Sequence, residues 1–174
     1  MPEDPRPLSE GAKTAAVRVA GKHRRVQPFL RGRNRAVVVE PNITDRRQAP
    51  GSEQAVVGLY DYSNNRSLVA VVDVKSEEVL HVEETPVQFQ LAPDEQKEAE
   101  ALAAGDSRVE EFLRNREMNP ITRLYFPPQA KKDSPPHRYA IVFVRPDDDE
   151  RRFVVVDLSE QVVVDVFGPE TLPG

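Results

Sequence analysis

The stretch LAPDEQKEAEALAAGDSRVEEFLRNR, residues 91–116, decides the fold because the chain contains it twice. Residues 8–33, LSEGAKTAAVRVAGKHRRVQPFLRGR, align with it without a gap when Leu8 is placed on Leu91. Repetition in one register is the mark of an internal duplication, so we expect two halves of similar structure. The identical pairs are Leu8/Leu91, Ala16/Ala99, Ala20/Ala103, Arg25/Arg108, Val26/Val109, Phe29/Phe112, Leu30/Leu113, Arg31/Arg114 and Arg33/Arg116.

Apolar residues recur in the first copy at the spacing of an amphipathic helix, which predicts a helix over residues 8–30 with Ser9 as its N-cap. Pro28 cannot donate a backbone hydrogen bond, so this helix should kink or break near residues 21–24. The second copy has Pro93 at its first turn and Glu111 in the place of Pro28. We therefore expect the second helix to run straighter.

Each predicted helix is followed by segments with the apolar, β-branched composition of strands. Asn64 and Asn65 tolerate the left-handed backbone of a tight turn, which predicts a hairpin at residues 63–66. A second turn is expected at residues 75–78, and irregular loops at residues 42–53 and 129–137. The expected strands are residues 35–41, 54–62, 67–75 and 79–84 in the first half, and 121–126, 139–145, 152–158 and 162–167 in the second.

The two strand sets also align, since LVAVVDV at residues 68–74 matches RFVVVDL at residues 152–158 and places Asp73 on Asp157. The sequence therefore predicts an α+β protein, a tandem duplication of a cystatin-like unit in which a helix crosses a four-stranded antiparallel sheet. The expected domains are residues 8–86 and 87–170, between a disordered tail at 1–7 and a short tail at 171–174.

The central strands are apolar on both faces, because Val69 and Val71 alternate with Ala70 and Val72. A unit's own helix can cover only one of these faces. The other would be an exposed apolar patch unless the sister half or a second copy of the chain covers it. We therefore expect the halves to pack tightly and the protein to form a homodimer.

Composition narrows the possible functions. The chain has no cysteine, which excludes disulfides and thiolate sites and fits a reducing cytoplasm. We expect a cytoplasmic protein without a membrane span, since no apolar run approaches about 18 residues. Residues 1–50 hold 11 of the 24 basic residues but 5 of the 29 acidic ones, an asymmetry that favours docking of halves or subunits. Nucleic acid is not an expected partner, because aromatic platforms are missing.

No pattern predicts a catalytic residue, a cofactor site or a metal site. The three histidines, His23, His81 and His137, lack the spacing of metal ligands and are expected on the surface. The acidic run at residues 147–150 lacks the EF-hand pattern and predicts a solvated turn. Asp73 and Asp157, which recur at the same strand end, are expected to accept backbone hydrogen bonds.

One strand carries the candidate interaction residues. Gln54, Val56 and Gly58 form a Q-x-V-x-G motif similar to the protease-binding hairpin of the cystatins, although the tryptophan of that family's second loop is absent. The candidate interaction residues are Gln54, Val56, Gly58, Tyr60 and Tyr62. Two alternatives stay open: a cystatin-type protease inhibitor, and a small-ligand carrier with a deep pocket that Tyr60, Tyr62, Tyr139 or Phe143 would line.

A longer resemblance spans about residues 8–168. The segments VVGLYDYSNNRSLVAVVDVKSEEVLHVEETP, LAPDEQKEAEALAAGDSRVEEFL and AIVFVRPDDDERRFVVVDLSEQVVVDVFG are similar to the two small N-terminal α+β domains of the copper-containing amine oxidases. In that family the resemblance implies a separate catalytic domain with a topaquinone made from Asn-Tyr-Asp/Glu-Tyr, a copper held by three histidines and a catalytic aspartate. Leu59 precedes Tyr60 where that motif has Asn, and no H-x-H pair occurs.

A well-formed fold without recognisable chemistry predicts a non-catalytic binding or assembly module. Its expected partner is a protein or a second copy of the chain. The sequence does not indicate which small molecule, if any, it binds.

Overall fold

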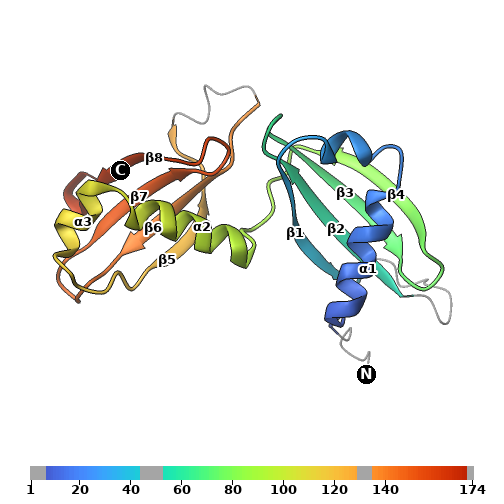
Figure 1. Cartoon of the computed structure of the whole chain (residues 1–174), viewed down its shortest axis with the longest axis horizontal. Helices are drawn as coiled ribbons and strands as arrows, with labels where there is room; N and C mark the ends of the chain where they lie inside the picture. The colour runs from blue at the N-terminus through green and yellow to red at the C-terminus, as the bar shows by residue number, and fades with distance from the viewer. Residues whose placement is uncertain (1–6, 44–52, 129–134, 172–174) are drawn as a thin grey trace. The chain divides into compact units, whose positions relative to one another are not determined.

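The computed structural model describes residues 7–43, 53–128 and 135–171 (Figure 1). Contacts divide the chain into two units, Met1–Phe89 and Gln90–Gly174. The sequence placed this boundary between residues 86 and 87, but Phe89 falls in the first unit, where its ring lies against Gly58. The expected terminal tails, apart from Pro7 and Thr171, lie outside the described residues, as do residues 44–52 of the first expected loop and residues 129–134 of the second.

The first unit is one helix on an antiparallel sheet (Figure 1). The strand order is β1-β2-β3-β4, and each strand pairs with its neighbour in the sequence. Its elements are α1 (Glu10–Gly21), the 3₁₀ helix η1 (Gln27–Leu30), β1 (Asn34–Pro41), β2 (Gln54–Asp61), β3 (Arg66–Asp73) and β4 (Glu78–Thr85).

The predicted start and break of the first helix are confirmed. Ser9 Oγ accepts the backbone N–H of Ala12 at 3.1 Å and caps α1. The helix ends at Gly21, and the chain resumes as η1 with Pro28 in its first turn. Phe29 of η1 is buried, as expected for a core residue.

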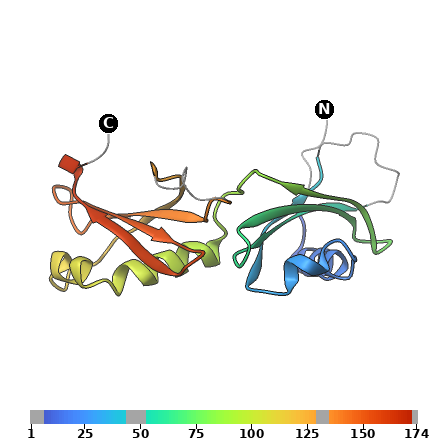
Figure 2. The same ribbon diagram turned by 90° about the horizontal axis from the view of Figure 1, so that it is seen from above.

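The second unit repeats the design with strand order β5-β6-β7-β8. Figure 2 shows that in each unit the helices lie against one face of the sheet only. No helix in the described part of the chain is long and apolar enough to cross a membrane. The elements are α2 (Pro93–Ala104), α3 (Ser107–Leu113), β5 (Ile121–Tyr125), β6 (Tyr139–Val144), β7 (Arg152–Asp157), β8 (Val162–Phe167) and the 3₁₀ helix η3 (Pro169–Thr171).

The prediction of a straighter second helix is wrong. Helix α2 ends at Ala104, with Gly105 as its C-cap. Asp106 is extended, and its Oδ1 accepts the Arg108 backbone N–H at 2.9 Å. Glycine is a poor helix former, and aspartate is favoured at an N-cap over a helix interior. The Gly105-Asp106 pair therefore starts a new helix, α3, whatever stands at residue 111.

The α+β class and the duplicated unit expected from the sequence agree with the two sheets. Side chains at repeat-related positions share their environment: Ala16 and Ala99, and likewise Ala20 and Ala103, are fully buried. The last hairpins share an irregularity too. The register shifts at one extra residue in each edge strand, Leu80 in β4 and Val164 in β8.

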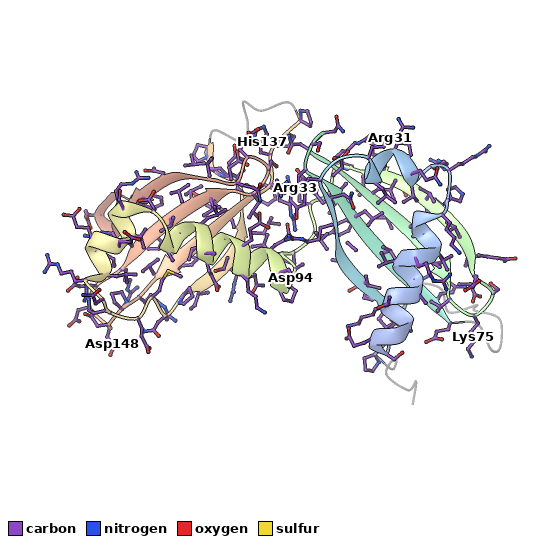
Figure 3. All side chains as sticks on the ribbon, in the orientation of Figure 1. Arg31, Arg33, Lys75, Asp94, His137 and Asp148 are labelled. Carbon is purple, nitrogen blue, oxygen red and sulfur yellow. The ribbon has the colours of Figure 1, made fainter. Side chains whose placement is uncertain are left out.

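An aspartate shapes each of the four tight turns that the structure describes, those that join β2 to β3, β3 to β4, β6 to β7 and β7 to β8. Asp73 Oδ1 accepts the backbone N–H groups of Lys75 and Ser76 at 3.0 and 3.2 Å, as predicted for this strand end (Lys75 is labelled in Figure 3). Asp157 accepts the N–H of Glu160 at 3.0 Å. Asp61 and Asp147 begin the other two turns in the same way, and left-handed residues complete three of the four turns: Asn65, Glu77 and Gln161.

The cap of α3 is testable. Asp106→Ala should lower the free energy of unfolding by about 1 kcal/mol at pH 7, since the cap is lost, whereas Asp106→Asn keeps a capping oxygen and should cost less. The Arg108 guanidinium donates to Asp106 and holds the pKa of that carboxyl below its usual value. The charged form therefore stabilises the fold above about pH 4, and this contribution disappears as the pH falls through the lowered pKa.

Urea unfolding at pH 7 and pH 3 measures both effects. The difference in the free energy of unfolding between the natural protein and the Asp106→Asn variant should be smaller at pH 3 than at pH 7. Equal losses for the Ala and Asn variants at pH 7 would contradict the capping role.

Candidate interaction surface

The five predicted interaction residues do share one face. Alternate residues of β2 point to opposite sides, and Ala55, Val57 and Leu59 are part of the core cluster that includes α1. Gln54, Val56, Gly58 and Tyr60, which alternate with them, and Tyr62 just beyond the strand therefore face away from the helix. We call this side of the β1–β4 sheet the outer face of unit 1 (Figure 2).

The two tyrosines of this face are structural. Tyr60 and Tyr62 are 1% and 3% exposed, and their rings meet edge to face at 5.0 Å. Tyr60 donates its hydroxyl hydrogen to Asn65 Oδ1 at 3.2 Å, and the Arg33 guanidinium lies 4.0 Å from the centre of the Tyr62 ring. Tyr60 is a strand residue before a turn, as predicted. Both rings are already packed, so they offer little surface to another molecule.

Gly58 makes room for an aromatic ring. A Cβ atom at this position would lie 2.8 Å from Cε2 of Phe89, closer than real contacts allow. In the second unit the equivalent place on β6 is Phe143, which pairs with Phe153 as Gly58 pairs with Val69. An aromatic ring thus lies at this place in both units, supplied in the first by the segment after β4 and in the second by the strand itself.

The Q-x-V-x-G motif lies within a central strand and not in an exposed loop. β2 is hydrogen-bonded to β1 on one side and to β3 on the other. Gln54 Oε1 accepts a hydrogen bond from the Asn42 side chain at 2.9 Å. A protease cleft requires a protruding hairpin, and this geometry does not offer the motif in that form.

The outer face of unit 2, on the β5–β8 sheet, is aromatic, which sequence reasoning missed. The Phe153 ring meets Phe143 edge to face at 5.1 Å and stacks on Phe167 at 5.4 Å. Tyr139 and Val155 are buried in a cluster with Tyr125. The sequence did contain a signal for this face, because Tyr139 and Phe143 lie an even number of residues apart in one predicted strand.

His137 and Asp157 form a pair that the sequence did not predict. His137 Nδ1 lies 2.8 Å from Asp157 Oδ2, and the imidazole stacks on Tyr139 at 6.0 Å (His137 is labelled in Figure 3). The histidine side chain is 24% exposed, so this residue, which the sequence predicts at the surface, is partly covered there. The carboxylate fixes the orientation of the ring. Among the described residues, no three His, Asp or Glu side chains gather where they could hold a metal ion.

A buried ion pair ties α2 to the start of β6. Arg138 Nε lies 2.6 Å from Glu95 Oε2 and Nη2 lies 2.8 Å from Oε1, with both side chains fully buried. Glu95 Oε1 also accepts the Ala92 backbone N–H at 3.0 Å. The repeat gives no hint of this contact, because Ala12 occupies the place of Glu95 in the first unit.

The acidic run at residues 147–150 is a turn held by an arginine. Asp147 is the turn aspartate, and Arg116 bonds to both Asp147 and Glu150 at 2.7 and 3.2 Å. The pKa of Asp147 is lowered, chiefly because its carboxylate accepts a hydrogen bond from the backbone N–H of Glu150. Asp148 points outward at this exposed tip (Figure 3).

Two of the surface hollows are lined by described residues alone. One, of about 600 Å³, adjoins the β6–β7 turn around Asn119, Arg145 and Asp148. The other, of about 300 Å³, separates the turn after α1 from β4. Neither is lined by the four aromatic residues that the ligand-carrier alternative requires, so these hollows do not support it.

Comparison with known proteins does not assign the chain to a family. The sequence matches no protein family, and no curated protein matches it.

Because the Phe89 ring packs directly on Gly58, any side chain at residue 58 should destabilise the fold. Gly58→Ala should lower the free energy of unfolding by about 1–3 kcal/mol, because the new methyl group and the ring cannot both fit. The double variant Gly58→Ala/Phe89→Ala should lose little more than Phe89→Ala alone. Urea unfolding of the three variants tests this coupling.

Gly11→Ala is the control for this experiment. Gly11 lies in α1, and a Cβ there would approach only Ser9 Oγ, at 4.0 Å. This change should stabilise the protein by up to about 1 kcal/mol. A Gly58→Ala variant as stable as the natural protein would contradict the role given to Phe89.

The buried pair gives a further prediction. Glu95→Ala leaves the Arg138 charge buried without its carboxylate and should cost about 3–5 kcal/mol, whereas Glu95→Met/Arg138→Met should cost less. Asp94→Ala, at an exposed position of the same helical turn (Figure 3), should cost less than about 1 kcal/mol. The melting temperatures of the three variants give their order of stability. A Glu95→Met/Arg138→Met variant less stable than Glu95→Ala would contradict the argument.

Proposed function

We propose that this protein is a non-catalytic assembly module that associates with a second copy of itself through the outer faces of its sheets. The observation that carries the proposal is the one-sided cover of each sheet. Helices pack on one face only, while the opposite faces carry aliphatic and aromatic side chains (Figure 2).

The outer face of unit 1 supports this use. Val56, Val69 and Val71 lie on it and are only half-buried within the chain. A contiguous apolar patch on a sheet is typical of a surface that binds protein. Since a stable interface buries about 800 Å² on each partner, a four-stranded sheet face has suitable dimensions.

The outer face of unit 2 has the same character. Phe143, Phe167 and Tyr125 are half-buried on it and surround the buried Val155. Aromatic residues contribute much of the binding energy in protein interfaces. A helical segment followed by a four-stranded meander occurs in both units, which supports the resemblance to the accessory domains of amine oxidases.

Self-association is testable with a paired substitution. Val69→Lys/Val71→Lys places two charges on the outer face and should raise the dimer dissociation constant by about 10- to 100-fold. Sedimentation equilibrium between 1 and 100 μM measures this constant. Ile43→Lys/Val87→Lys is the control, because both side chains already lie in solvent, at 64% and 59% exposure.

Two results would contradict the proposal. A natural protein that remains monomeric at 100 μM has no such interface. Turnover of primary amines by the purified protein in the presence of copper would show that the module is catalytic. Circular dichroism of each variant separates a lost interface from a lost fold.

A further inference from the structure

The edge of β4 is a second surface, distinct from the outer faces. β4 ends the strand order β1-β2-β3-β4 and pairs with β3 on one side, whereas its other edge pairs with no described strand. The backbone groups of a free edge can pair with an extended segment of another chain. The charges of β4 lie toward its ends, at Glu78, Glu83 and Glu84, and its middle, residues 79–82, carries no carboxylate.

A groove runs beside this uncharged middle. It holds about 300 Å³ and lies between Val79 to Val82 of β4 and the turn that follows α1. The turn contributes His23, Arg24 and Arg25 to its wall. One side of the groove is therefore apolar backbone and side chain, and the other is basic.

Arg24 and Arg25 are both exposed, and neither forms an ion pair with another described residue. The repeat shows how such an arginine is otherwise neutralised. Arg108, the counterpart of Arg25, pairs with Asp106 at 3.0 Å, whereas the counterpart of Asp106 in the first unit is His23. The first unit thus lacks the internal carboxylate and presents positive charge to the groove.

An exposed leucine lies at the same place. Leu80 is the extra residue of the β4 irregularity, it lines the groove, and it is 48% exposed. A large apolar side chain beside unpaired charges and a free strand edge is typical of a peptide-binding surface.

We propose that the β4 edge of unit 1 binds an extended acidic peptide from another protein, which adds a fifth strand to the sheet. The backbone of the peptide pairs with β4, and its carboxylates on the α1 side lie against Arg24 and Arg25. On the opposite side the peptide meets His81 and Glu83, so acidic residues are disfavoured there. The ligand is therefore a segment with acidic residues at alternate positions.

Titration with a synthetic probe tests this. The fluorescent, capped peptide Glu-Val-Glu-Val-Glu-Val should bind, as measured by anisotropy, and its Lys-Val-Lys-Val-Lys-Val counterpart should not. Arg24→Glu/Arg25→Glu should weaken binding by about tenfold or more, since charge pairs across an interface govern partner choice. Arg31→Glu makes the same change at an exposed position of the same segment away from the groove (Figure 3) and should alter binding less than about twofold.

Strand addition has a separate signature. N-methylation of the alternate peptide amides that face β4 should abolish binding, and methylation of the other set should leave it intact. Amide exchange at residues 79–82 should slow when the peptide is bound.

Four results would overturn the proposal. They are no binding at millimolar probe, equal losses for Arg31→Glu and the groove variant, indifference to both N-methylated sets, and a changed oligomeric state of Arg24→Glu/Arg25→Glu without peptide. The last would mean that a second copy occupies the edge. The outer-face variant Val69→Lys/Val71→Lys should still bind the probe, which keeps this test independent of self-association.

Discussion

Close packing of alanines between helix and sheet is the contact on which each unit depends. In the first unit Ala16 and Ala20 of α1 are fully buried, as are Ala55 and Ala70 of the sheet. In the second, Ala99 and Ala103 of α2 and Ala140 of β6 are likewise fully buried. Small residues let a helix approach a sheet closely, and any larger side chain would push the layers apart. This requirement explains why the duplicated segments keep these alanines.

The opposite faces of the sheets are free of that requirement, and there the two copies have diverged. One copy has a glycine that receives a ring from the segment after β4, and the other has a phenylalanine in the strand. Duplication has therefore preserved the buried alanines of the helix-facing layer, apart from Ala12 of α1, which corresponds to Glu95 of α2, while each outer face acquired its own chemistry.

Most of the fold could be predicted from the sequence because it depends on local signals. Ser9, Pro28 and the Asn64-Asn65 turn act within a few residues, and the structure confirms each of them. The break at Gly105 had a local signal too, the Gly105-Asp106 pair, but the prediction of a straight helix relied on the absence of a proline at residue 111.

The contacts that could not be predicted join residues far apart in the sequence. Glu95 lies in the first turn of α2, where an acidic residue already favours the helix dipole, and nothing local indicates an arginine 43 positions later. His137 and Asp157 meet only because β6 and β7 are neighbours in register. For the candidate surface, the period-two pattern placed five residues on one face. It could not show that the tyrosines are buried there by their own neighbours, with Tyr60 held by Asn65 and Tyr62 by Arg33.

The meander order of the strands has a consequence for synthesis of the chain. Every strand pairs with its neighbour in sequence, so all the sheet partners of the first unit lie before residue 86. This unit can complete its sheet while the second is still being translated, since domains generally fold as units during synthesis. Tandem repeats of similar sequence are prone to exchange strands with one another. Early closure of the first sheet removes its strands from that competition before their near-copies emerge.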